Sequence, residues 1–105
     1  MTTIVYSVST LDIRILESQP SRLAIRVGGE VSSPGWTGFR LDHRAHIAPP
    51  ADGVYEADVV GVRPGGTVPD VITPFGFNEI WSPIPAGLKG FRIFSATDSV
   101  TTALQ

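Results

Sequence analysis

The residues best suited to chemistry lie together in residues 42–46, Asp-His-Arg-Ala-His. Two histidines three positions apart share one face of a helix and can bind a metal ion there. On a β-strand the same spacing places His43 and His46 on opposite faces. The surrounding alternation predicts a strand, so we expect no metal site here. We expect His43 to be a core histidine with one hydrogen bond, His46 to be solvated, and Asp42 to point away from His43.

Other signatures of catalysis are missing from the sequence. Activation of a serine needs a base, an orienting acid and an oxyanion site, and the sequence has no Gly-x-Ser-x-Gly elbow. No glycine-rich loop precedes a helical pattern, and there is no cysteine to bind zinc. We therefore predict no catalytic residue, no cofactor and no metal site, and an enzyme is the third hypothesis for function.

Four aromatic residues lie near turn signals and are candidate binding residues: Trp36, Trp81, Phe75 and Phe77. Aromatic side chains on the loops of a β-domain can form a platform for sugar rings or a hot spot for a protein partner. The alternative is that these side chains fill the open ends of a sandwich.

Four arginines are the other candidate binding residues: Arg22, Arg26, Arg40 and Arg44. They occupy the polar positions of the two clearest strand patterns. If these strands pair as a hairpin, the guanidinium groups form one stripe that can bind an anion or an acidic partner. If the two strands belong to different sheets, the stripe is split. The alternative is a solvated face of mixed charge.

The clearest of these patterns is residues 22–31. Leu23, Ile25, Val27 and Val31 alternate with polar residues, which is the period of a strand with one apolar and one wet face. We predict that Ile25 is buried and that Arg26 is exposed. The adjacent glycines 28 and 29 indicate a β-bulge.

Turn signals divide the rest of the chain into further short segments, because eleven glycines and nine prolines are spread through it. Residues 54–62 have apolar residues of both parities, which predicts burial on both faces or a bulge. Pro69 indicates that its segment lies at a sheet edge. The other predicted strands are residues 4–8, 11–15, 39–47, 68–73, 76–81, 90–96 and 100–104.

Seven to nine short strands with no helical pattern predict an all-β fold, a single antiparallel β-sandwich domain over residues 1–105. Trp36 and Tyr55 lie where immunoglobulin-like domains often carry a buried tryptophan and a tyrosine corner, and this favours the immunoglobulin-like version. A small β-barrel is the alternative.

Composition limits the partners and the location. Eight basic and ten acidic residues give a net charge of −2, which argues against a nucleic-acid binder. No apolar run is long enough for a membrane span, and no leader pattern is visible at the start. We expect a soluble protein, cytoplasmic as the sequence stands and secreted if a leader has been removed.

These observations favour a non-catalytic protein-interaction or assembly module, with a small carbohydrate-binding module as the alternative. We also predict a homodimer formed through an edge strand, because Lys89 is the sole lysine and lysines commonly protect such edges. The candidate edge is residues 4–8, from Ile4 to Val8, which contain neither proline nor charge.

Overall fold

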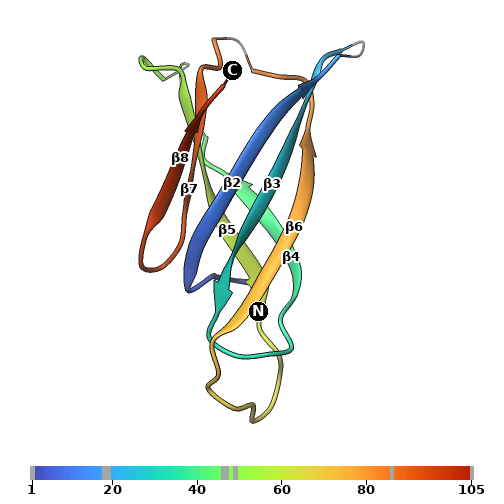
Figure 1. The fold of residues 1–105 in the computed structure, drawn as a ribbon, viewed down its shortest axis with the longest axis vertical. Coiled ribbons are helices and arrows are strands. Elements are labelled where there is room, and N and C mark those ends of the chain that lie inside the picture. The colour runs from blue at the N-terminus through green and yellow to red at the C-terminus, as the bar shows by residue number, and fades with distance from the viewer. Residues whose placement is uncertain (1, 18–19, 46–47, 49, 86, 105) are drawn as a thin grey trace.

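The computed structural model describes residues 2–17, 20–45, 48, 50–85 and 87–104. This part of the chain contains eight β-strands and no helix, arranged as two facing sheets (Figure 1). The prediction of a small all-β sandwich is confirmed. The strands are β1 (Thr2–Ile4), β2 (Ser7–Leu16), β3 (Arg22–Val31), β4 (Thr37–His43), β5 (Val54–Val62), β6 (Thr73–Trp81), β7 (Gly90–Phe94) and β8 (Ser99–Ala103).

The two sheets differ in width. Sheet A has β5 at its centre, with β4 along one side, β1 and β7 sharing the other side, and β8 beyond β7. Sheet B has three strands in the order β2-β3-β6. All pairs are antiparallel except β5 with β7, which run parallel. No ladder among the described residues joins the sheets, so the arrangement is a sandwich and not the alternative barrel. The immunoglobulin-like version stays a prediction.

Strand β3 supplies much of the core from the centre of sheet B. Ile25 is 1% exposed, and Leu23, Val27 and Val31 are buried beside it, whereas Arg26 is exposed. The predicted assignment of the two faces of this strand is therefore confirmed. Sheet A contributes the facing layer, which includes Leu41, Ala57, Val59, Phe91 and Ile93.

The predicted bulge lies on the partner strand and not at the glycines. The β2–β3 register shifts between Val8 and Thr10, opposite Gly28 and Gly29. A Cβ at position 29 would meet the carbonyl oxygen of Ser7, so glycine is needed there for β2 to approach. The glycine pair therefore accommodates the irregularity of its neighbour.

The prediction of one strand over residues 4–8 is wrong, because the chain crosses between the sheets there. Ile4 pairs with Val60 in sheet A, whereas Val8 pairs with Gly29 in sheet B. Between them, the Val5 N–H donates to the Val59 carbonyl, and the Val5 carbonyl accepts the Ala96 N–H. The segment is thus not a single continuous edge.

Other predicted boundaries differ at the turns. Residues 68–72 form no strand, and β6 instead begins at Thr73 and includes Pro74, which an edge strand tolerates. Strand β4 ends at His43, and β7 ends at Phe94. Strand β5 has the predicted bounds, and Val60 is buried although it faces outward, so this strand is buried on both faces there.

No helix in the described ranges is long and apolar enough to span a membrane.

Candidate functional site

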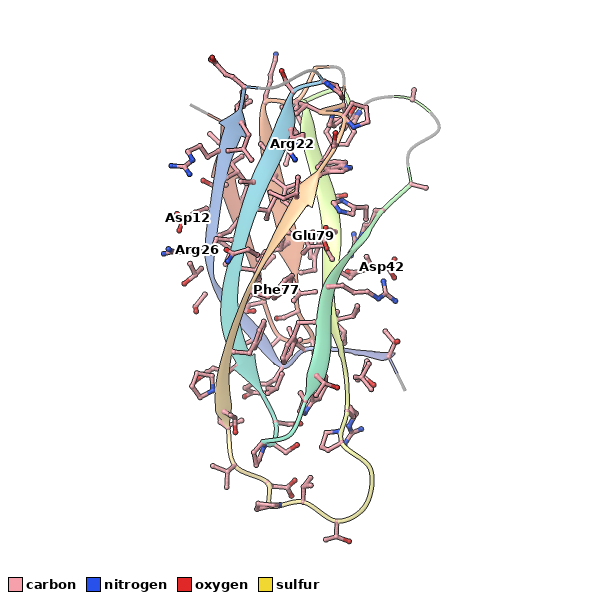
Figure 2. The ribbon with its side chains drawn as sticks, turned by 90° about the vertical axis from the view of Figure 1, so that its right-hand side faces the viewer. Asp12, Arg22, Arg26, Asp42, Phe77 and Glu79 are labelled. Carbon is pink, nitrogen blue, oxygen red and sulfur yellow. The ribbon has the colours of Figure 1, made fainter. Side chains whose placement is uncertain are left out.

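One polar pair bridges the two sheets along the seam between β4 and β6, the side that faces the viewer in Figure 2. The Glu79 carboxylate reaches from β6 to β4 and accepts the Leu41 N–H at 3.2 Å through Oε1. Its Oε2 lies 3.0 Å from His43 Nε2. About a quarter of each of these two side chains is exposed. Glu79 therefore covers an unpaired backbone group at the edge of β4 and holds the imidazole.

The imidazole of His43 is enclosed by aromatic rings. Its centroid lies 4.3 Å from Trp81 and 5.8 Å from Phe91. A carboxylate accepts hydrogen bonds, so a neutral His43 carries its proton on Nε2 and presents a bare Nδ1. Nδ1 is buried and has no hydrogen-bond partner among the described residues. The single hydrogen bond of His43 agrees with the prediction, but its side chain is half-buried at the border of the core. His46 lies outside the described residues.

A histidine beside a carboxylate is also part of a catalytic triad, so this pair must be weighed as a base. In a triad the carboxylate orients one ring nitrogen, and the other nitrogen takes the proton of a nucleophile. Here that second nitrogen is the buried Nδ1, which faces no hydroxyl among the described residues. The geometry favours a structural role for His43 and Glu79, which tie β4 to β6. Asp42 lies on the other face of β4, 3.9 Å from Arg40.

Aromatic side chains fill the same seam next to this pair. Phe39 stacks on Phe75 with ring centroids 4.6 Å apart and planes 7° apart. Trp36 and Phe77 stack on Phe39 at 6.4 and 6.2 Å, and the Trp36 indole N–H donates to Ser33 Oγ. All of these rings are half-buried against the core. Phe39 and Phe75 cover one another's ring faces, and the whole cluster packs against the core. This arrangement is more typical of side chains that fill space between sheets than of a flat platform for sugar rings.

The structure thus brings together three of the predicted aromatic residues, Trp36, Phe75 and Phe77, through Phe39, which the sequence did not single out. Trp81 lies apart from them and contacts His43 and Tyr55 instead.

The predicted arginine stripe does not form. Arg22 and Arg26 belong to β3 in sheet B, whereas Arg40 lies in β4 of sheet A and Arg44 directly follows that strand. Strands β3 and β4 are consecutive, but they pair with different neighbours, β3 with β2 and β6, and β4 with β5. The sandwich topology therefore splits the stripe, as the alternative interpretation required.

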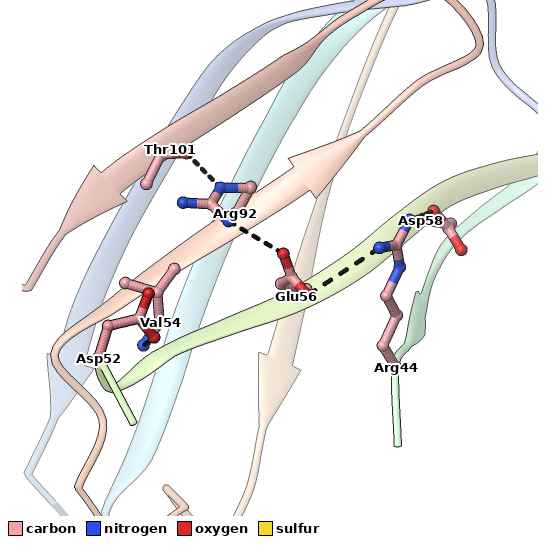
Figure 3. Close-up of polar contacts among 7 residues, drawn as sticks. All are labelled: Arg44, Asp52, Val54, Glu56, Asp58, Arg92 and Thr101. Carbon is pink, nitrogen blue, oxygen red and sulfur yellow. Dashed lines mark hydrogen bonds and ion pairs between the residues drawn. The ribbon is translucent and has the colours of Figure 1, made fainter. Parts of the chain in front are cut away.

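The outer face of sheet A carries a closed network of charges (Figure 3). Arg92 contacts the Glu56 carboxylate at 3.0 Å and donates to Thr101 Oγ1 at 2.9 Å. Arg44 donates to Asp58 at 2.9 Å and also lies 3.9 Å from Glu56.

Two further interactions hold Arg44 in this network. Its guanidinium lies over the Phe94 ring, 4.0 Å from the centroid. The hydrogen bond that Arg44 donates to Asp58, together with the attraction of the Asp58 and Glu56 carboxylates, raises the pKa of Arg44 against a smaller opposing effect of burial. The charges on this face are thus satisfied within the chain.

The outer face of sheet B is instead hollowed. One hollow of about 490 Å³ lies over β2, β3 and β6, with Ala24 on its floor and Arg14, Arg26, Asn78 and Ile80 around it. A second hollow of about 300 Å³ continues from it along the sheet and shares Arg26 and Asn78. We call the two together the sheet B trough.

Glycines floor the second half of this trough. Thr10, Gly28 and Gly76 lie side by side across the three strands in one register row. Neither this row nor Arg14 was predicted as a site from the sequence. The signal was present in β6, where glycine and isoleucine occupy the outward parity between inward aromatic residues.

Glu79 was also missed, although a signal for it exists in the sequence. It shares its parity with Phe75, Phe77 and Trp81, so it is an acidic residue in an otherwise apolar column. His43 is the matching polar residue on the apolar side of β4. Two such residues on inward positions of different strands predict a buried pair.

Metal binding and known relatives offer no further assignment. No three histidine, aspartate or glutamate side chains gather into a possible metal site within the described ranges. Comparison with known proteins finds no family model that matches the chain, and it finds no similar curated protein and no matching solved structure.

Proposed function

We propose that the protein is a non-catalytic protein-interaction or assembly module. The observation that carries this proposal is where the exposed aliphatic side chains lie. Val71 and Ile72, on the loop between β5 and β6, are 55% and 47% exposed, and Ile80 beside the sheet B trough is 49% exposed. Val71 and Ile72 are adjacent, and contiguous apolar side chains exposed to solvent are typical of surfaces that a partner covers.

The other candidate residues make their interactions within the chain, which leaves the exposed aliphatic residues as the surface for a partner. The ion pairs of sheet A satisfy one another, and His43 and Glu79 tie the sheets together. The stacked aromatic residues of the β4–β6 seam fill space between the sheets, which favours the module over the carbohydrate-binding alternative. None of these groups is needed for a partner to bind at the exposed aliphatic residues.

Site-specific photo-crosslinking in cells that produce the protein tests this proposal. The chain has one lysine, so amine-reactive reagents would report on little of the surface. A photoreactive phenylalanine replaces Val71 in one variant and Ile80 in another, and the matched control carries it at the exposed Ser99 on β8. We expect discrete protein adducts from positions 71 and 80 and none from position 99. Absence of protein adducts at 71 and 80 would contradict the proposal.

A further inference from the structure

The loop formed by residues 63–72 extends beyond the ends of both sheets, at the bottom of Figure 1. Its last part is held in a defined turn, because the Val71 N–H donates to the Pro69 carbonyl and the Thr73 hydroxyl donates to the Val71 carbonyl. Val71 and Ile72 remain about half exposed, and Asp70 is exposed beside them. An ordered loop that presents two adjacent aliphatic residues has little conformational entropy to lose on binding.

The sheet B trough has the complementary properties. Ile80 offers an exposed aliphatic side chain at one wall, and Ala24 leaves the floor low. Arg14 stands at the rim and forms no ion pair with any described residue, whereas the neighbouring Arg26 has Asp12 at 3.4 Å. The trough therefore combines an apolar wall with an arginine available to a carboxylate.

Gly76 leaves this surface open to close approach by another chain. Its φ is not in the left-handed region, and an added Cβ would meet the Val27 carbonyl oxygen at 3.5 Å and nothing nearer. The fold of one copy therefore does not require glycine there. A glycine within a strand lowers stability relative to alanine, because it loses more conformational freedom on folding. Close approach of a ligand or another backbone is a recognised reason for such a glycine.

We propose that residues 69–72 of one copy lie in the sheet B trough of a second copy. Val71 and Ile72 pack against Ile80 and against the floor of the trough, which Ala24, Gly28 and Gly76 form. The Asp70 carboxylate pairs with Arg14. The loop extends away from the face of its own sheet B, so the trough is filled by the loop of another molecule. This inference rests on the proposed function and names a second copy as the partner.

The first test uses two double variants that each remove one side of the contact. V71S/I72S removes the apolar loop residues, and A24S/I80S makes the floor and the apolar wall of the trough polar. Sedimentation analysis of the wild-type chain should show a mass that rises above that of one chain as concentration increases. Each double variant should associate at least about tenfold more weakly, as expected for the loss of aliphatic anchors.

Mixing the two variants is the decisive step. Each variant keeps the half that the other has lost, so the intact loop of A24S/I80S can enter the intact trough of V71S/I72S. The equimolar mixture should form a one-to-one complex that neither variant forms alone. A mixture that stays monomeric while the wild type associates would overturn the inference.

Charge reversal checks the register of the contact. D70R and R14E should each weaken association, and their mixture should restore it, because every loop then meets a trough of opposite charge. The matched control is V62S, which removes a side chain 36% exposed on the outer face of sheet A and should leave association unchanged. Loss of association in V62S without loss in V71S/I72S would place the interface elsewhere and overturn the inference.

The outcome also separates this inference from the proposed function. A wild-type chain that is monomeric at all concentrations overturns the second-copy contact. If photo-crosslinking at positions 71 and 80 then captures a different protein, the interaction module stands with another partner. If it captures none, both proposals fail.

Discussion

The two outer faces of the sandwich use similar residues in opposite ways. On sheet A the arginines Arg44 and Arg92 are paired with Glu56 and Asp58 and supported by Phe94 or Thr101. On sheet B, Arg26 has a loose and well-exposed contact with Asp12, and Arg14 has none among the described residues. On the outer face of sheet A the charged groups are paired within the chain. The outer face of sheet B exposes the Arg14 charge, the Ile80 side chain and glycines to solvent. The difference indicates where a partner can add stability.

The largest expected effect concerns the core that both faces cover. Ile25→Ala should lower the free energy of unfolding by about 2–5 kcal/mol, because it removes fully buried methyl groups and leaves a cavity. Arg26→Ala, one position along on the outer face of sheet B, should change it by less than about 0.5 kcal/mol. Urea denaturation of both variants measures this. Equal costs at the two positions would contradict the assignment of the faces of β3.

The next largest effect concerns the seam between β4 and β6, where Glu79 joins the two sheets. Glu79→Ala leaves the Leu41 N–H and His43 without their acceptor. This should lower the free energy of unfolding by about 1–3 kcal/mol. Glu30→Ala on the outer face of sheet B is the control, with an expected change below about 0.5 kcal/mol. Thermal unfolding of the two variants distinguishes them, and similar midpoints would show that the bridge between the sheets contributes no stability.

A direct comparison of the two faces comes from removing one carboxylate from each. Glu56→Ala should lower the free energy of unfolding by about 1–2 kcal/mol, because Arg92 loses its ion pair with Glu56 in a partly buried network. Asp12→Ala should cost less than about 0.5 kcal/mol, since its pair with Arg26 is about two-thirds exposed. Denaturant midpoints at low and high salt test this. A larger loss for Asp12→Ala would reverse the ranking of the faces.

The smallest effect concerns the glycines of sheet B. Gly76→Ala should raise the free energy of unfolding by about 0.5–1 kcal/mol, because the position has room and an ordinary φ. Gly29→Ala should instead destabilise the protein, since its Cβ would meet the backbone of β2. Calorimetry on the two variants measures both signs. A destabilising Gly76→Ala would mean that the fold itself requires that glycine.

Local alternation in the sequence predicted much of the fold, because each face of a strand keeps its own residue types. It placed Ile25 in the core, gave β5 its bounds and assigned His43 to the inward parity of β4. It failed where the chain leaves one sheet for another. Nothing in residues 4–8 marks the crossing at Val5, since β-branched residues suit both sheets.

The candidate site was less predictable for a different reason. The contacts of Glu79 with Leu41 and His43, and the trough between β2, β3 and β6, join residues that are distant in sequence. Their formation depends on which strands pair, and alternation within one strand carries no information on that choice. The split of the four arginines has the same origin.

The pairing of β1 with β5 has a consequence for how the protein folds. Thr2 and Val62 are partners, so the first strand of the chain cannot be placed until more than half of the chain has been synthesised. The parallel β5–β7 pair adds another long-range closure. Domains dominated by such distant pairings fold in about milliseconds to seconds, slower than helical proteins of equal size. During that time the consecutive strands β2 and β3 can pair early, and the apolar inner face of this hairpin then remains open to solvent until sheet A closes over it.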